Sequence, residues 1–340
     1  MQKYIFHLSG ESLSLATEEV KALFETYDLK YKILKQKNGL LLIESSASEK
    51  QVLKLSERSA MIKSSGILIS TLKNLLLSEI GKINWNFVKM PYCVRVEDLT
   101  GDAPPGIETK LASPIWWFFE KKSKDVSVNL TNPKTTVYFI LDKNIIYLQK
   151  LIWKAEKGRF IGREPMKKPA FHPTALKPKL ARLLVNLSRA QEKELFLDCF
   201  CGTGSILIEA AIIGCKVFGV DIDKKMINAS KTNLNFYKIK KYKLINGNAT
   251  QLENCFKSNS VEAIATDPPY GRSSRIGAKN IHELYKNFLK SAYKVLKRGD
   301  YLALMYPHYE KLVIKKFKIV TREKIYVHSS LTRNIIVLKK

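Results

Sequence analysis

Cysteine and histidine are scarce in this 340-residue sequence, with five of each. The cysteines lie at positions 93, 199, 201, 215 and 255, without paired CxxC spacing and without a histidine cluster nearby. Neither a disulfide framework nor a metal site is therefore expected, and reduced thiols are the simplest account of the five.

Long apolar runs are also missing, since no stretch reaches the length of a transmembrane helix. At the start of the chain, Lys3 and His7 interrupt the apolar residues and no small-residue cleavage site follows, so we expect no signal peptide. These absences predict a soluble, cytoplasmic protein with no membrane partner.

Acidic residues are outnumbered: 31 Asp and Glu stand against 58 Lys and Arg, a net charge of +27. Residues 1–150 have 21 basic and 16 acidic residues, whereas residues 151–340 have 37 and 15. So large a positive charge attracts polyanions, of which nucleic acid is the commonest for such a protein. The alternative, lysine spread over every solvated surface, does not account for the concentration in the C-terminal part.

The length predicts more than one hydrophobic core, because single cores rarely grow beyond about 250 residues. The hydrophobic share of 45% and the charged share of 26% are those of a globular protein. Residues 1–47 have the pattern strand, helix, strand, which indicates a small ferredoxin-like α+β unit. Residues 48–150 repeat this pattern, with helices expected at 48–60 and 111–120 and strands at 92–99, 125–130, 136–142 and 144–150.

Turn residues between the last three of these strands favour a meander. Residues 151–170 mix glycine, proline and cations with poor periodicity, which is typical of a linker. From residue 171 to 340, apolar strands alternate with helical stretches. This alternation predicts an α/β domain with a doubly wound, mostly parallel sheet covered on both faces.

The first candidate ligand site follows the strand ELFLD, where Asp198 precedes a turn containing Gly202 and Gly204. Ligands of open α/β sheets bind where strands end, and glycines let the backbone approach them closely. Asp221 ends the next strand about 20 residues on, where an acid commonly accepts the hydroxyls of a ribose. Asn248 ends a third strand and is either an adenine contact or a turn residue. A glycine-rich turn alone would equally serve a dinucleotide enzyme.

The sequence ATDPPYGR is more specific, because the apolar strand VEAIA delivers Asp267, Pro268, Pro269 and Tyr270 at its carboxyl end. The carboxylate of Asp267 and the carbonyl of Pro268 can both accept from one amine, which has two protons to donate. Tyr270 offers a ring for stacking a flipped base. The motif predicts a pocket for an aromatic amine that attacks a methyl donor directly, with no metal and no covalent protein intermediate.

These segments resemble the archaeal tRNA (guanine-10-N2) methyltransferases, a THUMP-domain family with a Rossmann-like catalytic domain. KDVSVNLTNPKTTVYFI is similar to the end of a THUMP domain, and FHPTALKPKLARLLVNLSR, DCFCGTGS, DPPYGRSSR and HSSLTRNIIVL resemble the catalytic half in order. The resemblance implies a THUMP RNA-binding domain at 48–150, a linker at 151–170 and an S-adenosylmethionine-dependent domain at 171–340. The implied reaction is methylation of the exocyclic N2 of a tRNA guanosine, at position 10, once or twice.

The resemblance also implies roles for single residues. The residues implied to bind the target base are Asp267, Pro268, Pro269 and Tyr270. The residues implied to hold S-adenosylmethionine are Phe171, His172 and Pro173 at its methionine end, Asp198, Cys199, Gly202 and Gly204 in the loop, Asp221 at the ribose, and Asn248 with Ala249 near the adenine.

Two residues depart from the family pattern. The loop usually reads DPFCGTG, but Cys199 replaces the proline, and Asn248 replaces an acid near the adenine, which weakens the expected cofactor affinity. In the terminal motif, His328 and Arg333 either contact base or phosphate or stabilise a hairpin. His282 is expected on a helix surface.

Two other functions stay open. One is methylation of another amine, such as adenine N6 in DNA or a glutamine side chain, although such enzymes more often have Asn at the first motif position. The other is an RNA-binding protein without activity, for which Cys199 and Asn248 are the support. Besides tRNA, the resemblance leaves open a small zinc-binding activator subunit, and a monomer is expected otherwise.

Overall fold

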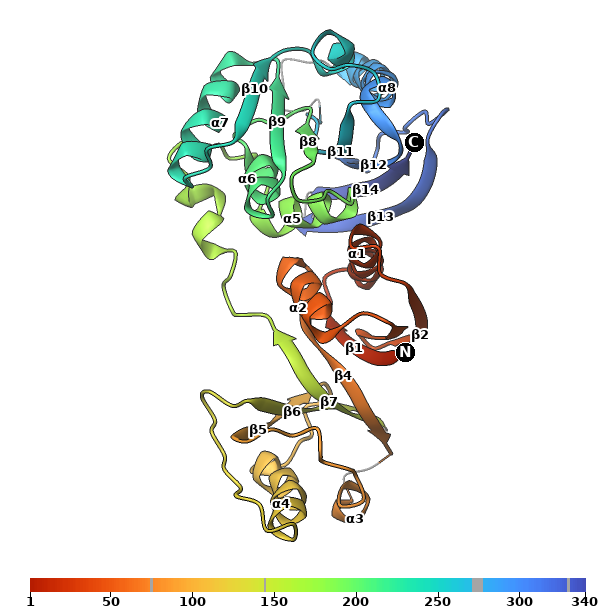
Figure 1. Ribbon diagram of the computed structural model, residues 1–340. Helices are drawn as coiled ribbons and strands as arrows, with labels where there is room; N and C mark the ends of the chain where they lie inside the picture. The colour runs from red at the N-terminus through yellow and green to blue at the C-terminus, as the bar shows by residue number, and fades with distance from the viewer. Residues whose placement is uncertain (74–75, 144, 271–277, 329–330) are drawn as a thin grey trace. The chain divides into compact units, whose positions relative to one another are not determined.

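The computed structural model describes residues 1–73, 76–143, 145–270, 278–328 and 331–340, with the backbone alone at 278–280, 326–328 and 331. Two compact units each contain one seven-stranded sheet. Unit 1 comprises Met1–Leu8, Leu29–Glu57 and Ile62–Ala155, and unit 2 comprises Ser9–Asp28, Arg58–Met61 and Glu156–Lys340 (Figure 1). No helix in the described ranges is long and apolar enough to cross a membrane.

The sheet of unit 1 has the strand order β2-β3-β1-β4-β7-β6-β5. Its β5 and β6 are parallel and its other neighbours antiparallel. The strands are β1 (Gln2–Leu8), β2 (Tyr31–Lys37), β3 (Leu40–Ser45), β4 (Ile62–Leu72), β5 (Tyr92–Asp98), β6 (Thr135–Asp142) and β7 (Ile145–Lys154). The helices near them in sequence are α2 (Glu49–Arg58), α3 (Leu77–Ile80) and α4 (Ile107–Glu120).

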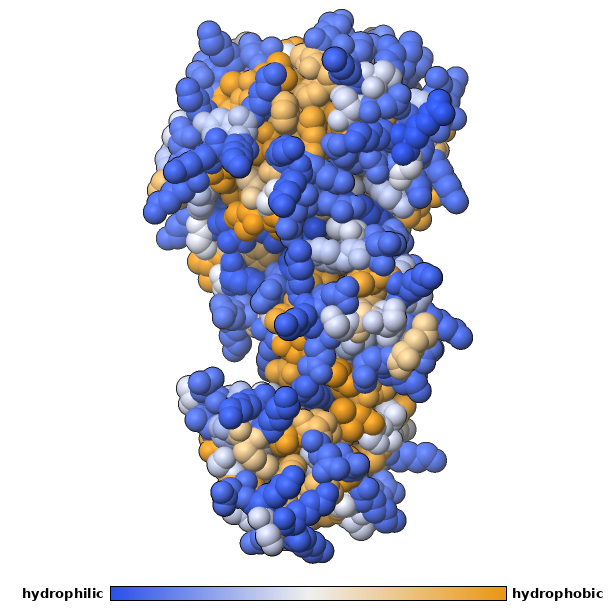
Figure 2. Space-filling model, viewed as in Figure 1, coloured by the Kyte–Doolittle hydropathy of each residue, from blue (hydrophilic) through white to orange (hydrophobic). Residues whose placement is uncertain are grey.

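Strand β6 is buried on both faces of this sheet. Val137 and Phe139 pack with Ile115 of α4 in one apolar cluster, whereas Tyr138 and Ile140 pack in a second cluster. Alternate residues of a strand point to opposite faces, so one apolar run serves both clusters. The face of the molecule in Figure 2 is mainly hydrophilic, as expected when such clusters are enclosed.

The predicted strand at 125–130 and the three-stranded meander were wrong, because only Val128 forms an isolated bridge, with Tyr92. Strand β4 was not predicted, since Ser64, Ser65 and Gly66 break its apolar pattern although both serines are buried. A Cβ on Gly66 would lie 2.5 Å from the carbonyl oxygen of Lys150 on β7, so the close approach of two strands requires glycine.

The domain borders predicted from the sequence do not coincide with the ends of the sheets. β1 is hydrogen-bonded to β3 on one side and to β4 on the other, so the border at 47/48 divides a single sheet. β7 continues to Lys154, which places the first residues of the predicted 151–170 linker in a strand. The division into four domains stays a prediction.

The sheet of unit 2 has the order β10-β9-β8-β11-β12-β14-β13, and its first five strands are parallel. β14 is antiparallel to both of its neighbours. The strands are β8 (Leu195–Asp198), β9 (Lys216–Asp221), β10 (Tyr242–Asn246), β11 (Val261–Thr266), β12 (Leu296–Pro307), β13 (Lys318–His328) and β14 (Leu331–Lys339). This arrangement confirms the mostly parallel α/β sheet predicted for the C-terminal half.

The helices of unit 2 include one from the start of the chain. They are α1 (Leu13–Thr26), α5 (Pro178–Leu187), α6 (Ser205–Ile212), α7 (Lys224–Phe236) and α8 (Ala278–Val295), with the 3-10 turns η1 (Ile161–Arg163), η2 (Pro165–Lys167) and η3 (Ala249–Asn254). Phe288 of α8 packs with Leu197 of β8 and Ile264 of β11 in an apolar cluster of the sheet.

Buried polar contacts join three separate segments within unit 2. The carboxylate of Glu19 on α1 accepts from the backbone N–H groups of Ala60 and Met61 at 2.6 and 2.7 Å. Asn186 of α5 donates to the same carboxylate at 2.7 Å and accepts from Arg58 Nε at 2.9 Å. Because Glu19 and Asn186 are fully buried, removing one partner would leave the other's polar atoms unsatisfied.

Candidate active site

The candidate site lies where the strand order of the parallel sheet reverses. β8 has β9 on one side and β11 on the other, so the connections leaving these strands diverge. Asp198 ends β8 and Asp267 directly follows β11. The carboxyl ends of strands at such a switch point form the usual ligand crevice of an open α/β sheet.

The turn after β8 needs its two glycines. Gly202 and Gly204 have φ angles of +48° and +83°, in the left-handed region that side chains disfavour. A Cβ on Gly204 would also lie 3.0 Å from Ser230 Oγ, and that hydroxyl donates to the Gly202 carbonyl at 2.7 Å. The loop is therefore fixed against α7, and α6 starts directly after Gly204.

Asp221 at the end of β9 is tied to this loop and remains partly exposed. Its Oδ2 accepts from the backbone N–H of Gly202 at 2.8 Å, and its Oδ1 accepts from the N–H of Asp223 at 2.9 Å. Burial nevertheless raises the pKa of Asp221. Each oxygen retains capacity for a further donor, such as a ligand hydroxyl.

Asp198 is 1% exposed and joins β8 to β11. Its Oδ1 accepts from Thr266 Oγ1 at 2.7 Å and from the N–H of Phe200 at 3.2 Å. Burial, together with the negative charges of Asp221 and Asp267, raises the pKa of Asp198 to about 7, although the hydrogen bonds from Thr266 and Phe200 oppose that rise. Three carboxylates that repel one another favour a cationic ligand between them.

A pocket with an empty volume of about 500 Å³, open mouth included, lies beside these groups. Its lining comes from the segment before α5, the β8–α6 loop, α7 and the end of β11. The lining residues are His172, Thr174, Ala175, Leu176, Asp198, Phe200, Cys201, Gly202, Thr203, Ser205, Ile206, Met226 and Asp267.

Four of the predicted site residues thus line one pocket, namely His172, Asp198, Gly202 and Asp267. Other predicted residues lie outside this lining. They are Phe171 and Pro173, both exposed beside it, Cys199, Gly204, Asp221, Asn248, Ala249, and the three motif residues after Asp267.

The two residues that depart from the family pattern have local structural roles. Cys199 is 1% exposed and packs in the apolar cluster of the sheet. Asn248 is exposed, and its Oδ1 accepts from the N–H and the hydroxyl of Thr250, both at 2.9 Å, which caps η3. Ala249 beside it is buried at 4%.

The base-binding motif forms a polar cluster at the end of β11. Pro268 is buried, while Asp267, Pro269 and Tyr270 are partly exposed. The hydroxyl of Tyr270 donates to Asp267 Oδ1, and Arg333 Nη1 lies 3.3 Å from Asp267 Oδ2. Burial raises the pKa of Asp267, whereas Arg333 opposes that rise. The Tyr270 ring lies beside the Arg333 guanidinium, which is 4.8 Å from the ring centroid.

Sequence patterns missed several groups of this site. Thr203 and Met226 line the pocket, and Lys168, 5% exposed, donates to the lining residue Ser205 at 2.6 Å. Burial lowers the pKa of Lys168 to about 8. Nothing in the residue spacing signals these contacts. Residues 271–275 of the DPPYGRSSR segment and the side chain of His328 lie outside the described residues.

Comparisons with known proteins agree with this geometry. The family model described as "RMKL-like, methyltransferase domain" matches residues 165–335. The crystal structure of TrmN from Thermus thermophilus superposes with a TM-score of 0.54 over 99% of both chains, at 17% identity, and so shares the fold. The sheet order, the pocket and the domain match together define a methyltransferase.

Two full-length relatives narrow the class. The tRNA (guanine(10)-N2)-dimethyltransferase of Methanothermobacter thermautotrophicus is 31% identical over 338 residues, 98% of each chain. That of Pyrococcus abyssi is 32% identical over 340 residues, 96% of each chain. The chain belongs to the tRNA (guanine(10)-N2)-dimethyltransferase family.

S-adenosylmethionine is the cofactor of this family, and the residues present fit it. The ligand has a cationic sulfonium and an ammonium group, which suit the carboxylates of Asp198 and Asp267 at the pocket. It also has ribose hydroxyls, which suit the partly exposed carboxylate of Asp221. The described residues contain no group of three or more His, Cys, Asp or Glu positioned to hold a metal ion.

Proposed function

We propose that this enzyme methylates the exocyclic N2 of guanosine 10 in tRNA and adds a second methyl group to the same nitrogen. The observation that carries the proposal is Asp267, a carboxylate that directly follows β11, lines the pocket and is followed by two prolines and a tyrosine. The full-length similarity to enzymes named for this reaction supports the choice of base and position.

The cofactor would be held by Asp221 at its ribose and by the β8–α6 loop. When bound, S-adenosylmethionine supplies an electrophilic methyl group. Gly202 and Gly204 keep the loop backbone bare, which lets a ligand approach it without meeting side chains. The cofactor role of Asn248 and Ala249 stays a prediction, because neither residue lines the pocket.

At the base, Asp267 and the carbonyl of Pro268 would accept the two protons of the N2 amine. Tyr270 would stack on the guanine, an interaction worth about 1–3 kcal/mol per base. In the present arrangement the Tyr270 hydroxyl occupies Asp267 Oδ1. That oxygen keeps a second lone pair, so an incoming amine can donate to it beside the tyrosine hydroxyl.

Asp267 need not be a strong base. The N2 protons become acidic only when the nitrogen has gained its new bond and a positive charge, and one proton then leaves. A carboxylate already hydrogen-bonded to that nitrogen receives the proton and passes it to water. What the protein contributes is alignment and a fixed negative charge beside the developing positive one.

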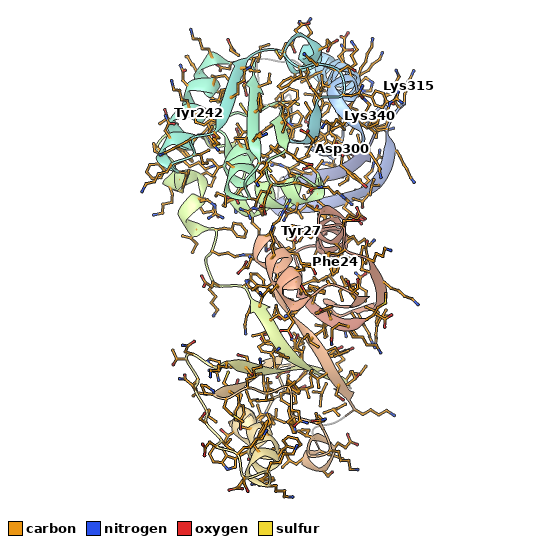
Figure 3. All side chains as sticks on the ribbon, viewed as in Figure 1. Phe24, Tyr27, Tyr242, Asp300, Lys315 and Lys340 are labelled. Carbon is orange, nitrogen blue, oxygen red and sulfur yellow. The ribbon has the colours of Figure 1, made fainter. Side chains whose placement is uncertain are left out.

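We propose that the tRNA backbone contacts the lysines of α7, of β10 and of the segment between them. Residues 224–252 contain no Asp or Glu, and the side chain of Phe236 among them is 55% exposed. Tyr242, labelled in Figure 3, marks this edge of the sheet. The exposed lysines are Lys224, Lys225, Lys231, Lys238, Lys240, Lys241 and Lys243. Basic and aromatic side chains without acids between them suit a phosphate backbone better than a merely solvated face.

Further parts of the proposal concern the rest of the chain. We propose that residues 48–150 are the THUMP RNA-binding domain, that the enzyme acts in the cytoplasm where tRNA is matured, and that it is a monomer unless a small zinc-binding activator subunit joins it. An inactive RNA-binding protein is disfavoured, because Cys199 and Asn248 have structural roles and their departure from the family pattern removes no group that lines the pocket.

Incubation of the purified protein with labelled S-adenosylmethionine and unmodified tRNA transcript tests the function. We expect label in N2-methylguanosine and N2,N2-dimethylguanosine at position 10, and none in a transcript with adenosine at that position. Label in N6-methyladenosine, or no label from protein that binds the cofactor by calorimetry, would overturn the proposal.

A further inference from the structure

We propose that Arg333 is a positioning residue of the methyl transfer, which holds the Asp267 carboxylate charged and in one orientation toward the target nitrogen. This inference rests on the proposed base site at Asp267. The sequence offered two roles for Arg333, a contact to base or phosphate and a hairpin contact. Its backbone pairs with Ile325 in the antiparallel β13–β14 pair, while its guanidinium lies at Asp267.

Arg333 reaches the site across the sheet. It lies on β14, paired with Pro307 at the carboxyl end of β12, and β12 is the neighbour of β11. Its side chain is 10% exposed, and its Nη1 is 3.3 Å from Asp267 Oδ2. An arginine this buried is a poor contact for a phosphate backbone in solvent and a good one for a carboxylate at a pocket.

The guanidinium contacts both parts of the base-binding motif. It pairs with Asp267 and lies 4.8 Å from the centroid of the Tyr270 ring. The Tyr270 hydroxyl occupies Oδ1 of Asp267, while Arg333 is at Oδ2. When an amine donates to Oδ1, the pairing at Oδ2 persists and keeps the carboxylate plane fixed.

Stability alone does not explain this arginine. Arg333 Nε is buried and has no hydrogen-bond partner among the described residues, and one of its Nη1 contacts is the weakly accepting sulfur of Met305 at 3.3 Å. A buried donor without an acceptor costs free energy, so a hydrophobic side chain of similar length would serve the fold as well. The pairing with Asp267 is what the positive charge adds.

The charges around Asp267 make that pairing necessary. The titratable or charged groups that face Asp267 and its neighbour Tyr285 are Asp198 from β8, Tyr270 after β11, Tyr285 from α8, Tyr309 and Glu310 after β12, and Arg333 from β14. Among the residues that the structure describes, Arg333 is the one permanent cation in this set. Without it, burial and the nearby Asp198 would favour the protonated form of Asp267, which has no negative charge to place beside the amine.

The test uses Arg333→Met, which keeps the length of the side chain, and Arg333→Lys, which keeps the charge. Single-turnover rates with saturating tRNA and cofactor are measured from about pH 6 to about pH 10. For Arg333→Met we expect a loss of about 100-fold at neutral pH, as for removal of one oriented polar group in an active site. The rate should recover in part at alkaline pH, where Asp267 ionises again, and the cofactor affinity should stay within about twofold.

Arg333→Lys should retain most of the neutral rate and a profile near that of the wild type. The control is Arg322→Met on the neighbouring strand β13, where Arg322 is exposed, and its pH profile should not move. An equal loss for Arg333→Met at every pH, or no loss in folded protein, would overturn the proposal. If Arg333→Met does not fold, the uncharged variant Arg333→Gln replaces it. The proposal would also be overturned if the pH profiles of Arg333→Lys and Arg333→Gln were shifted equally far to alkaline pH. Failure of the wild type to methylate tRNA would instead refute the proposed function.

Discussion

Thr266 Oγ1 donates a 2.7 Å hydrogen bond to Asp198 Oδ1 and so joins the carboxyl ends of β11 and β8 at the switch point of the sheet. Both residues are buried, at 0% and 1% exposure. The base-binding motif begins at the next residue after Thr266, so this contact holds the two halves of the site in register.

Thr266→Val should therefore destabilise the protein by about 1–3 kcal/mol, because a buried carboxylate loses a donor while the volume is conserved. Urea unfolding followed by fluorescence measures the change. The matched control is Thr250→Val, which removes a hydroxyl from an exposed cap at Asn248 and should cost less than about 1 kcal/mol. Equal effects of the two variants would contradict this account of Thr266.

The raised pKa of Asp198 predicts a pH dependence of stability. The folded protein keeps a proton on Asp198 up to a pKa of about 7, whereas the unfolded chain releases it near 3.8. Between these values the folded state binds more protons, so this group's contribution to stability falls as the pH rises. Relative to Asp198→Asn, which does not titrate, the wild type should lose stability in urea from about pH 4 to about pH 7. A constant difference across that range would refute the prediction.

Asp267→Ala should lower the methylation rate by at least about 100-fold while tRNA binding stays within about twofold, because the acceptor and negative charge at the amine are lost. Filter binding and single-turnover assays separate the two effects. Asp300→Asn is the control, since Asp300, labelled in Figure 3, lies near the amino end of β12 away from the pocket lining. Activity that survives in Asp267→Ala would show that the base binds elsewhere.

Asp221→Asn should weaken S-adenosylmethionine binding by about 10-fold to 100-fold and leave tRNA affinity unchanged, because a charged acceptor for the ribose and for the Gly202 N–H is lost. Calorimetric titration with the cofactor gives the affinity. Asp223→Ser removes a neighbouring charge but keeps the hydrogen bond that caps α7, so it should bind the cofactor as the wild type does. The prediction fails if both variants lose the same affinity.

Replacing Lys231, Lys238 and Lys241 with glutamate reverses three charges within residues 224–252, the stretch without Asp or Glu, and should weaken tRNA binding. The slope of log affinity against log salt should fall by about 2 to 3, since each lost phosphate contact removes somewhat less than one counterion. The same reversal at Lys315, Lys316 and Lys318 is the control, because Glu310 and Glu323 flank that stretch. Equal salt slopes in the two triple variants would count against an RNA contact at α7 and β10.

Much of the catalytic unit could be predicted because its signals are local. The alternation of apolar strands and helices predicted the parallel sheet, and the positions of Asp198 and Asp267 at strand ends follow from their place after apolar runs. The same reasoning failed at residues 125–130, where DVSVNL alternates like a strand but pairs only at Val128. Periodicity records which residues can be buried, not whether a neighbouring strand edge is available.

Arg333 could not be placed from the sequence, since it is 66 residues from its partner Asp267. The pairing arises because β14 inserts between β12 and β13, a choice of strand order that no local pattern records. Cys199 and Asn248 show the converse. The weakened cofactor affinity expected from Asn248 stays a prediction, whereas the packing of Cys199 and the cap formed by Asn248 are contacts that their departure from the family pattern did not signal.

Unit 2 is built from three separate segments of the chain, which limits how the enzyme can be truncated. The chain passes between the two units at five points, and the stretches Ser9–Asp28 and Arg58–Met61 belong with the catalytic sheet. A gene fragment that starts at residue 171 would encode every group of the pocket and yet leave Asn186 without Glu19 and Arg58. A fusion of this catalytic half to another RNA-binding module must therefore also include α1. Simple end-to-end fusion is for that reason a poor route to new substrates.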